Sequence, residues 1–362
     1  MSKNNPDRII RVLVVDDSAF VRKVLTNILS KSPFIEVVGT ARDGEEALEK
    51  VEELKPDVVT LDLIMPRLDG IGFLKEQMKR RPLPVVIVSI ASETGDLAIE
   101  ALNLGAVDII QKPTALASEK IYEISNELIE KVKNASMISL KKVKKVISLP
   151  TPKLEIKKEI KKTRVDVVVI GISTGGPQAL RYLIPKFPRD FPVPIAIVIH
   201  MPIGYTEIFA EKLNEISELE VKEAEDGDIL QGGKVYIAPA GKHMFFEKMD
   251  DKVLVRLDLK PLDTLHRPSA DVLFKSAGEI FGSRTLGIIM TGMGNDGLLG
   301  VEVIKSKGGI VFTESEETCI IYGMPRAVEE RGLSDKSIPL YNMAEEIINF
   351  VMGGSNNENS SY

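Results

Sequence analysis

Five side chains in the first third of the sequence could together bind a phosphoryl group and a metal ion. Asp16, Asp17, Asp62, Ser89 and Lys112 each end or follow a short apolar run. If these runs are parallel strands, their carboxyl ends meet at one edge of a sheet. Close carboxylates repel one another unless a cation neutralises them, and an all-oxygen site suits Mg²⁺, which takes phosphate as a further ligand. Alternatively, these side chains could be solvated or could cap helices, but that interpretation explains any one of them better than all five together.

A hydroxyl, an imidazole and a carboxylate in the second half could act as a nucleophile, its base and an orienting acid. Ser173 stands in Gly-Ile-Ser-Thr-Gly-Gly-Pro, whose small residues allow a sharp turn that exposes the hydroxyl beside backbone N–H groups. His200 and Asp296 each follow an apolar run, which predicts the same sheet edge for all three. Their order differs from that of the α/β-hydrolases. His243 and His266 are better suited to packing or substrate contact.

The loop around Asp296 also supports a different interpretation. Gly292, Gly294 and Gly297 fit the dinucleotide-binding fingerprint, and Glu314 follows 17 positions after the last glycine. This pattern would indicate a nucleotide-dependent oxidoreductase. Against it, the fingerprint normally opens its domain, and it leaves the serine and the first histidine without a role.

Strands and helices alternate in both parts of the chain, which predicts two doubly wound parallel α/β sheets. In the first part we expect strands at 10–15, 35–38, 58–61, 85–90 and 109–110, and helices at 21–29, 45–54, 71–78, 97–104 and 121–132. In the second part we expect strands at 165–172, 194–200, 219–224, 285–291 and 309–313. Three shorter apolar runs between 234 and 259, with Asp250 and Asp251 as turn residues, predict a small antiparallel ribbon.

The boundary between the two parts is expected in a basic stretch. Residues 131–164 carry 11 Lys and one Arg against two Glu, so they contribute +10 to a chain whose formal net charge is −6. We interpret this stretch as a linker, either a solvated tether or an arm that contacts an acidic surface. The expected domains are therefore 8–130 and 165–352, and the Asn- and Ser-rich end at 353–362 is expected to be disordered.

Composition narrows the class of protein further. The chain has 362 residues, 44% of them hydrophobic, and a single cysteine, Cys319, which excludes an internal disulfide. No apolar run approaches the roughly 20 residues needed to span a bilayer, and the polar start is unlike a signal peptide. We therefore expect a cytoplasmic protein without membrane insertion. Nothing in the sequence indicates a nucleic-acid-binding fold.

Three motifs in the first part resemble the response-regulator receiver domain, which has a flavodoxin-like fold. They are Val-Asp-Asp-Ser, Leu-Asp-Leu-Ile-Met-Pro-Arg-Leu-Asp-Gly and Gln-Lys-Pro, within about the first 125 residues. The resemblance implies that Asp62 is phosphorylated by a chemotaxis histidine kinase. It also implies Mg²⁺ held by Asp17, Asp62 and the backbone carbonyl of Ile64, with Asp16 assisting and with Ser89 and Lys112 on the phosphoryl group. Ile109 stands where receivers often carry an aromatic residue, which puts the usual relay in doubt.

Five ordered motifs from Val165 to about Phe350 resemble the Rossmann-like catalytic domain of the chemotaxis protein-glutamate methylesterases. They are Gly-Ile-Ser-Thr-Gly-Gly-Pro, His-Met-Pro, His-Arg-Pro-Ser-Ala-Asp-Val-Leu-Phe, Thr-Gly-Met-Gly-Asn-Asp-Gly and Tyr-Gly-Met-Pro-Arg-Ala. The resemblance implies Ser173 as nucleophile, His200 as base, Asp296 as orienting acid, the backbone N–H of Met293 as oxyanion donor, and Thr174 lining the site. No cofactor is implied for this domain.

The implied reaction is hydrolysis of glutamate γ-methyl esters on the cytoplasmic helices of methylated chemoreceptors. Glutamine deamidation is known in the family, but the sequence does not decide it for this chain. In the family, the receiver covers the catalytic face until phosphorylation loosens the contact. The other function classes that stay open are the oxidoreductase above and a non-enzymatic binding module controlled by phosphorylation.

Overall fold

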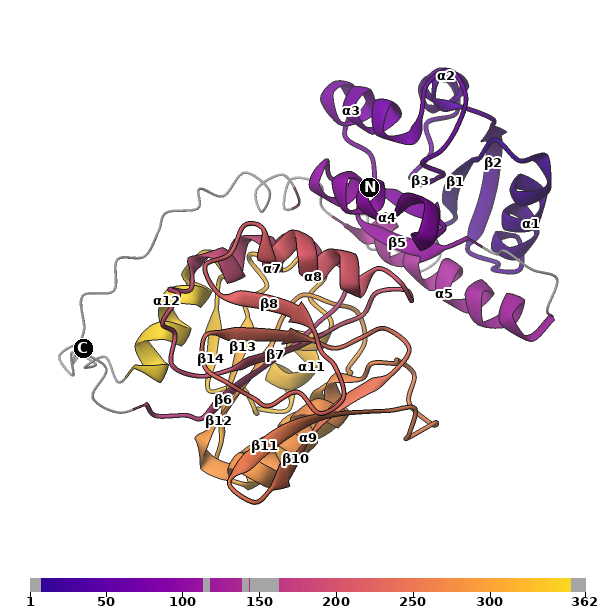
Figure 1. Cartoon of the computed structure of the whole chain (residues 1–362). Helices are drawn as coiled ribbons and strands as arrows, with labels where there is room; N and C mark the ends of the chain where they lie inside the picture. The colour runs from indigo at the N-terminus through magenta and orange to yellow at the C-terminus, as the bar shows by residue number, and fades with distance from the viewer. Residues whose placement is uncertain (1–7, 113–117, 139–142, 144–162, 353–362) are drawn as a thin grey trace, which may run out of the picture. The chain divides into compact units, whose positions relative to one another are not determined.

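The computed structural model describes residues 8–112, 118–138, 143 and 163–352 (Figure 1). The chain divides into two compact units, which group residues 1–148 with 201–208 and residues 149–200 with 209–362. The basic stretch from 144 to 162 and the end at 353–362 lie outside the described residues. No helix in the described ranges is long and apolar enough to cross a membrane.

The first unit is a five-stranded sheet with the order β2-β1-β3-β4-β5, in which all pairs are parallel. The strands are β1 (Ile10–Val15), β2 (Ile35–Ala41), β3 (Val58–Leu61), β4 (Val85–Ser89) and β5 (Asp108–Gln111). The helices are α1 (Ala19–Leu29), α2 (Gly44–Leu54), α3 (Gly70–Arg80), α4 (Ala91–Asn103) and α5 (Ser118–Met137). The predicted parallel α/β arrangement is confirmed. Residues of β1 and β3 are buried on both faces, as a doubly covered parallel sheet requires.

Helix α5 corrects the predicted start of the linker at residue 131. The helix continues to Met137, and its later turns bury Val132 and Ala135. Lys131, the first residue of the expected linker, forms an ion pair with Asp108 and donates a hydrogen bond to the carbonyl of Ile109. The high lysine content concealed an apolar helix face, so residues 131–137 belong to the first unit.

The second unit contains a seven-stranded sheet with the order β14-β13-β12-β6-β7-β9-β8, again with parallel pairs throughout. The strands are β6 (Val167–Ile172), β7 (Ile195–Ile199), β8 (Glu220–Glu223), β9 (Lys234–Ile237), β12 (Thr285–Ile289), β13 (Ile310–Glu314) and β14 (Lys336–Ile338). The helices are α7 (Gly176–Leu183), α8 (Thr206–Asn214, grouped with this unit from residue 209 on), α9 (Ala270–Phe281), α10 (Leu298–Ser306), α11 (Met324–Glu330) and α12 (Leu340–Val351). Short 3₁₀ turns follow α7 and α9.

The antiparallel ribbon is smaller than predicted. Two of the three predicted runs, β10 (His243–Met249) and β11 (Lys252–Asp258), pair antiparallel, around a turn in which Asp250 has a positive φ of 53°. The first of the three short runs, Val235 to Ile237, instead belongs to β9 and pairs parallel with β7 and β8. Its three apolar residues are all buried, which is typical of an interior parallel strand and not of a ribbon edge.

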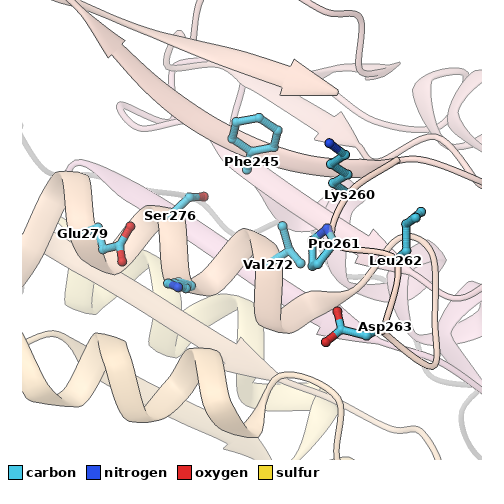
Figure 2. A pocket seen from close by; sticks show the side chains of 9 residues that line it. Phe245, Lys260, Pro261, Leu262, Asp263, Val272, Ser276 and Glu279 are labelled. Atoms are coloured by element: carbon cyan, nitrogen blue, oxygen red, sulfur yellow. The ribbon is translucent and has the colours of Figure 1, made fainter. Parts of the chain in front are cut away.

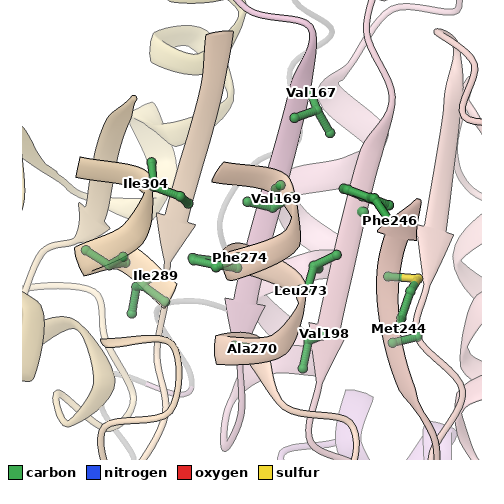
Figure 3. Close-up of a cluster of buried hydrophobic side chains, with 14 of the residues drawn as sticks. Val167, Val169, Val198, Met244, Phe246, Ala270, Leu273, Phe274, Ile289 and Ile304 are labelled. Carbon is green, nitrogen blue, oxygen red and sulfur yellow. The ribbon is translucent and has the colours of Figure 1, made fainter. Parts of the chain in front are cut away.

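Helix α9 forms the centre of the core on one face of this sheet. Leu273 and Phe274 pack over Val169 of β6 and Val198 of β7, together with side chains from the β10–β11 hairpin (Figure 3). In Figure 1, α7 and α12 lie across the sheet from α9. Because α9 is packed so tightly, the position of its first turn is fixed with respect to the ends of β6 and β7.

Helix α10 packs closely against α9. A Cβ atom on Gly300 would lie 2.5 Å from the Cβ of Phe274, so only glycine permits this approach. The Asp271 carboxylate in the first turn of α9 accepts a hydrogen bond from the backbone N–H of Gly300 at 2.8 Å. This bond joins the starts of the two helices.

Asp271 makes the stability of the second unit depend on pH. Burial raises the pKa of its carboxyl from 3.8 to about 6, and the nearby charge of Asp296 adds to the shift against the backbone hydrogen bonds that it accepts. The folded state therefore holds this proton more tightly than the unfolded chain. Its contribution to stability is fully present below pH 3.8 and is lost as the pH rises through about 6.

We predict that Asp271→Asn removes this loss, because the amide oxygen can still accept from Gly300 but carries no charge. Between about pH 5 and about pH 8, the free energy of unfolding of the variant should gain on that of the parent by about 1 kcal/mol. Urea unfolding at several pH values measures this difference. Asp251→Asn, at the exposed hairpin turn, is the control, and equal pH profiles for Asp271→Asn and the parent would contradict the prediction.

Candidate functional site

Ser173 and His200 stand side by side at the carboxyl edge of the second sheet. Ile172 pairs with Ile199 in the register of β6 and β7, and each of the two residues comes directly after one of these isoleucines. Neighbouring strands lie about 4.8 Å apart, so the backbones of the serine and the histidine are adjacent. The backbone N–H of His200 donates to the carbonyl of Ile172 at 3.2 Å, which extends the pairing to this position.

Asp296 binds the imidazole and, at the same time, the first turn of α9. Its Oδ2 lies 2.8 Å from Nε2 of His200. The carboxylate also accepts hydrogen bonds from Ser269 Oγ at 2.6 Å and from the backbone N–H groups of Ala270 at 2.7 Å and Asp271 at 3.2 Å. A helix N-terminus carries unpaired N–H groups and a positive partial charge, both of which stabilise an anion.

These contacts keep Asp296 ionised. Burial by itself would raise the pKa of the carboxyl, but the hydrogen bond and charge of His200, followed by the bonds from Ser269 and Ala270, hold the pKa well below its usual range. A carboxylate can only accept hydrogen bonds, so Nε2 of His200 must carry a proton. In the neutral imidazole, Nδ1 is then the basic nitrogen.

Nδ1 of His200 is buried and has no hydrogen-bond partner within the part of the chain that the structure describes. Among the described residues, no hydrogen bond joins it to Ser173, although the two residues are neighbours. Unbound hydrolases often lack a well-formed bond between nucleophile and base, which tightens when substrate binds. Of the three predicted side chains, Asp296 and His200 are therefore joined by a hydrogen bond. Ser173 is adjacent to His200 through the pairing of β6 with β7.

The loop after β12 approaches the serine very closely. A Cβ atom on Gly292 would lie 2.7 Å from the Cβ of Ser173, so a larger residue does not fit there. The carbonyl of Thr291 accepts from the backbone N–H of Ser173 at 2.9 Å, and its hydroxyl donates to the carbonyl of buried Thr174 at 3.0 Å. Next in the loop is Met293, whose backbone N–H has no acceptor among the described residues.

Glu314 does not have the surroundings that the dinucleotide interpretation requires. It lies at the end of β13, is fully buried, and accepts the backbone N–H of Thr291 at 3.0 Å. A residue in this position holds the loop beneath the site and cannot reach a ribose from the protein surface.

The two remaining histidines have different surroundings. The ring of His266 stacks on that of His200, with centroids 4.0 Å apart and planes 20° from parallel. His243 is fully buried, and burial lowers its pKa, although a hydrogen bond to the backbone of Pro261 opposes that shift. His266 is therefore part of the site, whereas His243 lies behind Ser269.

Sequence reasoning missed Ser269 as a contact of Asp296. A serine ahead of an apolar helical run is a recognisable helix start, and Ser269 is the residue that precedes α9. Its hydroxyl, however, makes no capping bond to its own helix. The capping acceptor is Asp296, far away in sequence, which no local pattern could reveal.

The predicted acidic cluster of the first unit is assembled. Oxygen atoms of Asp16, Asp17 and Asp62 all lie within 4.8 Å of one another. Nζ of Lys112 lies 2.9 Å from both Asp16 Oδ2 and Asp62 Oδ2. Asp16 and Asp62 are buried and Asp17 is exposed.

Burial dominates the electrostatics of this cluster. It raises the pKa of Asp16 and of Asp62, although the hydrogen bonds from Lys112 act in the opposite direction. Burial would lower the pKa of Lys112, but its bonds to the two carboxylates outweigh this and raise it. One ammonium therefore pairs with two carboxylates, Asp17 lies close to them, and the cluster retains an excess of carboxylates over ammonium groups.

The other predicted residues of this site lie near the cluster in the fold. Ser89 ends β4 and is fully buried, and Ile64 lies two residues beyond Asp62 with a half-exposed side chain. Ile109 is buried in β5, at the position where receivers often carry an aromatic residue.

A separate groove of about 690 Å³ lies beside the exposed face of α9 (Figure 2). Its lining includes Phe245 of β10, Val272 and Ser276 of α9, and residues 260–263. Ser173, His200 and Asp296 do not line it. The groove is therefore distinct from the site at the sheet edge.

Comparison with known proteins matches both units to family models. Residues 12–123 match the response regulator receiver domain, and residues 168–347 match the CheB methylesterase. A crystal structure of the Thermotoga maritima CheB methylesterase catalytic domain is similar, with a TM-score of 0.51 and 44% identity, covering 52% of this chain and 99% of that one. The oxidoreductase and binding-module alternatives are not favoured by these matches.

Whole-length relatives are similar as well. A protein-glutamate methylesterase/protein-glutamine glutaminase of Myxococcus xanthus is 50% identical, covering 92% of this chain and 96% of the relative. The corresponding Thermotoga maritima protein is 45% identical, covering 95% and 99%. With identity at this level over nearly its whole length, the chain belongs to the protein-glutamate methylesterase/protein-glutamine glutaminase family and joins a receiver domain to a CheB methylesterase domain.

Proposed function

We propose that this chain hydrolyses glutamate γ-methyl esters on the cytoplasmic helices of chemoreceptors, releasing methanol. The observation that carries the proposal is the Asp296–His200 pair beside Ser173, because it leaves the basic Nδ1 buried next to a serine. Glutamine deamidation would use the same three residues. The family's relatives carry both activities in their names.

In the first step, Ser173 Oγ donates to Nδ1 of His200, which takes the proton as the oxygen attacks the ester carbonyl. Asp296 stabilises the imidazolium that forms, because it already accepts the Nε2 proton. The imidazolium then protonates the departing methoxide, and methanol leaves. An acyl-enzyme on Ser173 remains.

In the second step, Nδ1 of His200 activates a water molecule that hydrolyses the acyl-enzyme. In both steps negative charge develops on the former carbonyl oxygen. The backbone N–H of Met293 supports the assignment of an oxyanion donor, because it lacks an internal acceptor and follows a glycine that touches Ser173. Thr174 lines the site beside the nucleophile.

We predict that Ser173→Ala and His200→Ala each lower methanol release from methylated receptor membranes by at least about a thousandfold, because a serine without its base is a poor nucleophile. Both variants should keep the melting temperature of the parent within a few degrees. Ser306→Ala, an exposed serine on α10, serves as the control. Near-normal release from either site variant would remove that residue from the mechanism.

We further propose that phosphorylation of Asp62 by a chemotaxis histidine kinase raises the esterase activity. The assembled acidic cluster and the lysine that reaches Asp62 support this assignment. Ser89 and Lys112 would contact the phosphoryl oxygens. A cytoplasmic location follows from these partners, since both the kinase and the receptor helices act there.

The residues present fit Mg²⁺. Three carboxylates lie close together and one ammonium pairs with only two of them, and a donor set made only of oxygen atoms is the one that Mg²⁺ prefers. Asp17, Asp62 and the carbonyl of Ile64 would hold the ion, with Asp16 assisting. When bound, it would neutralise charge on the incoming phosphoryl group.

We predict that Asp62→Asn abolishes labelling of the chain by a radioactive acyl phosphate, since the nucleophilic carboxylate is gone. Asp17→Asn should raise the Mg²⁺ concentration needed for half-maximal labelling by about tenfold or more, through loss of one ligand. Glu36→Gln, exposed on β2, is the matched control. Full labelling of the Asp62→Asn variant would show that another residue accepts the phosphoryl group.

A further inference from the structure

A second set of hydrogen bonds lies behind the Asp296–His200 pair. The hydroxyl of Ser269 donates to Asp296 Oδ1 at 2.6 Å, the shortest bond that this carboxylate accepts. The backbone N–H of the same serine donates to Nδ1 of His243 at 3.2 Å. Ser269 is 2% exposed and His243 is fully buried, so water does not compete for these groups.

The protonation of His243 is determined by its neighbours. Its Nε2 lies 3.0 Å from the carbonyl oxygen of Pro261, which only accepts, so Nε2 carries a proton. Nδ1 is then unprotonated and accepts the N–H of Ser269. Burial lowers the pKa of this imidazole, against the effect of the Pro261 contact, and this keeps it neutral.

The roles of the two carboxylate oxygens are also distinct. Oδ2 of Asp296 faces Nε2 of His200, and Oδ1 faces the hydroxyl of Ser269. The backbone N–H groups of Ala270 and Asp271 also donate to Oδ2 and Oδ1, at 2.7 Å and 3.2 Å. Rotation about the χ2 angle of a carboxylate has broad wells, and the Ser269 bond is the shorter of the two at Oδ1, so it contributes most at this oxygen to fixing the plane of the carboxylate against the imidazole.

We propose that Ser269 and His243 are positioning residues for the esterase reaction: His243 fixes the backbone of Ser269, and the Ser269 hydroxyl orients Asp296 and, through it, His200. This inference rests on the proposed function but concerns residues that have no contact with the ester. Neither residue is a base or a nucleophile in the reaction.

The hydroxyl also affects how strongly Asp296 binds the imidazole. It withdraws electron density from Asp296, and without it the carboxylate would attract the imidazolium more strongly. Other charged groups close to the network are Asp271 beside Asp296, and Arg267 and Asp258 beside His243, and none of them is altered by a change at Ser269.

The test replaces Ser269 by Ala and by Thr in the full chain, with Ser306→Ala as the control. For Ser269→Ala we expect kcat for methanol release to fall by about tenfold with KM unchanged. The acidic limb of the profile of kcat/KM against pH should move up by about half a unit. Ser269→Thr keeps the hydroxyl and should restore both values.

A second measurement needs no substrate. The chain has only three histidines, so the ¹⁵N signals of labelled imidazoles report on His200 directly. The Nε2 signal of His200 should move in Ser269→Ala and should stay unchanged when the same substitution is made in an Asp296→Asn background, because the hydroxyl acts through the carboxylate.

Each possible result either supports the positioning role of Ser269 or overturns it. A folded Ser269→Ala variant with parental kcat, or one with lower kcat but an unmoved His200 signal, would overturn the positioning role. An equally large movement of that signal in the parent and in the Asp296→Asn background would overturn it too. If the parent chain released no methanol, the proposed function would fail, while the NMR measurement would still decide whether Ser269 acts on His200.

Discussion

The catalytic unit depends on one interaction, the binding of the Asp296 carboxylate by the N-terminus of α9. Burial by itself would raise the pKa of this carboxyl, but His200, Ser269 and Ala270 together hold it well below its usual range, while the N–H groups of Ala270 and Asp271 fix the position of the carboxylate. Ionised and fixed in this way, Asp296 determines the tautomer of the imidazole. The packing of α9 over β6 and β7 therefore determines the chemistry as well as the stability of the unit.

Both units have carboxylates at an edge of their sheet, but the surroundings of these carboxylates differ. In the second unit, one carboxylate at a sheet edge is satisfied by a helix terminus, a serine and a histidine. In the first unit, three carboxylates lie close together at a sheet edge, and a single lysine pairs with two of them. The first arrangement is complete within the protein, whereas the second favours a divalent cation and a phosphoryl group.

Much of this could be predicted from the sequence, because parallel strands bring their carboxyl ends to one edge. Apolar runs ahead of Ser173, His200 and Asp62 were enough to place those side chains. The Ser269 contact could not be predicted, since it joins two segments whose proximity depends on how α9 packs. The predicted extent of the hairpin was wrong because the short run Val235–Ile237 is buried in a parallel strand. The predicted start of the linker was wrong because many lysines concealed the burial of Val132.

The most direct measurement of the central claim is the ¹⁵N chemical shift of the two ring nitrogens of His200 in the unliganded chain near neutral pH. We predict a protonated Nε2 and an unprotonated Nδ1, because Asp296 is ionised and accepts from Nε2. A neutral ring with its proton on Nδ1 would contradict the claim, since Nε2 would then have no proton to donate to Asp296.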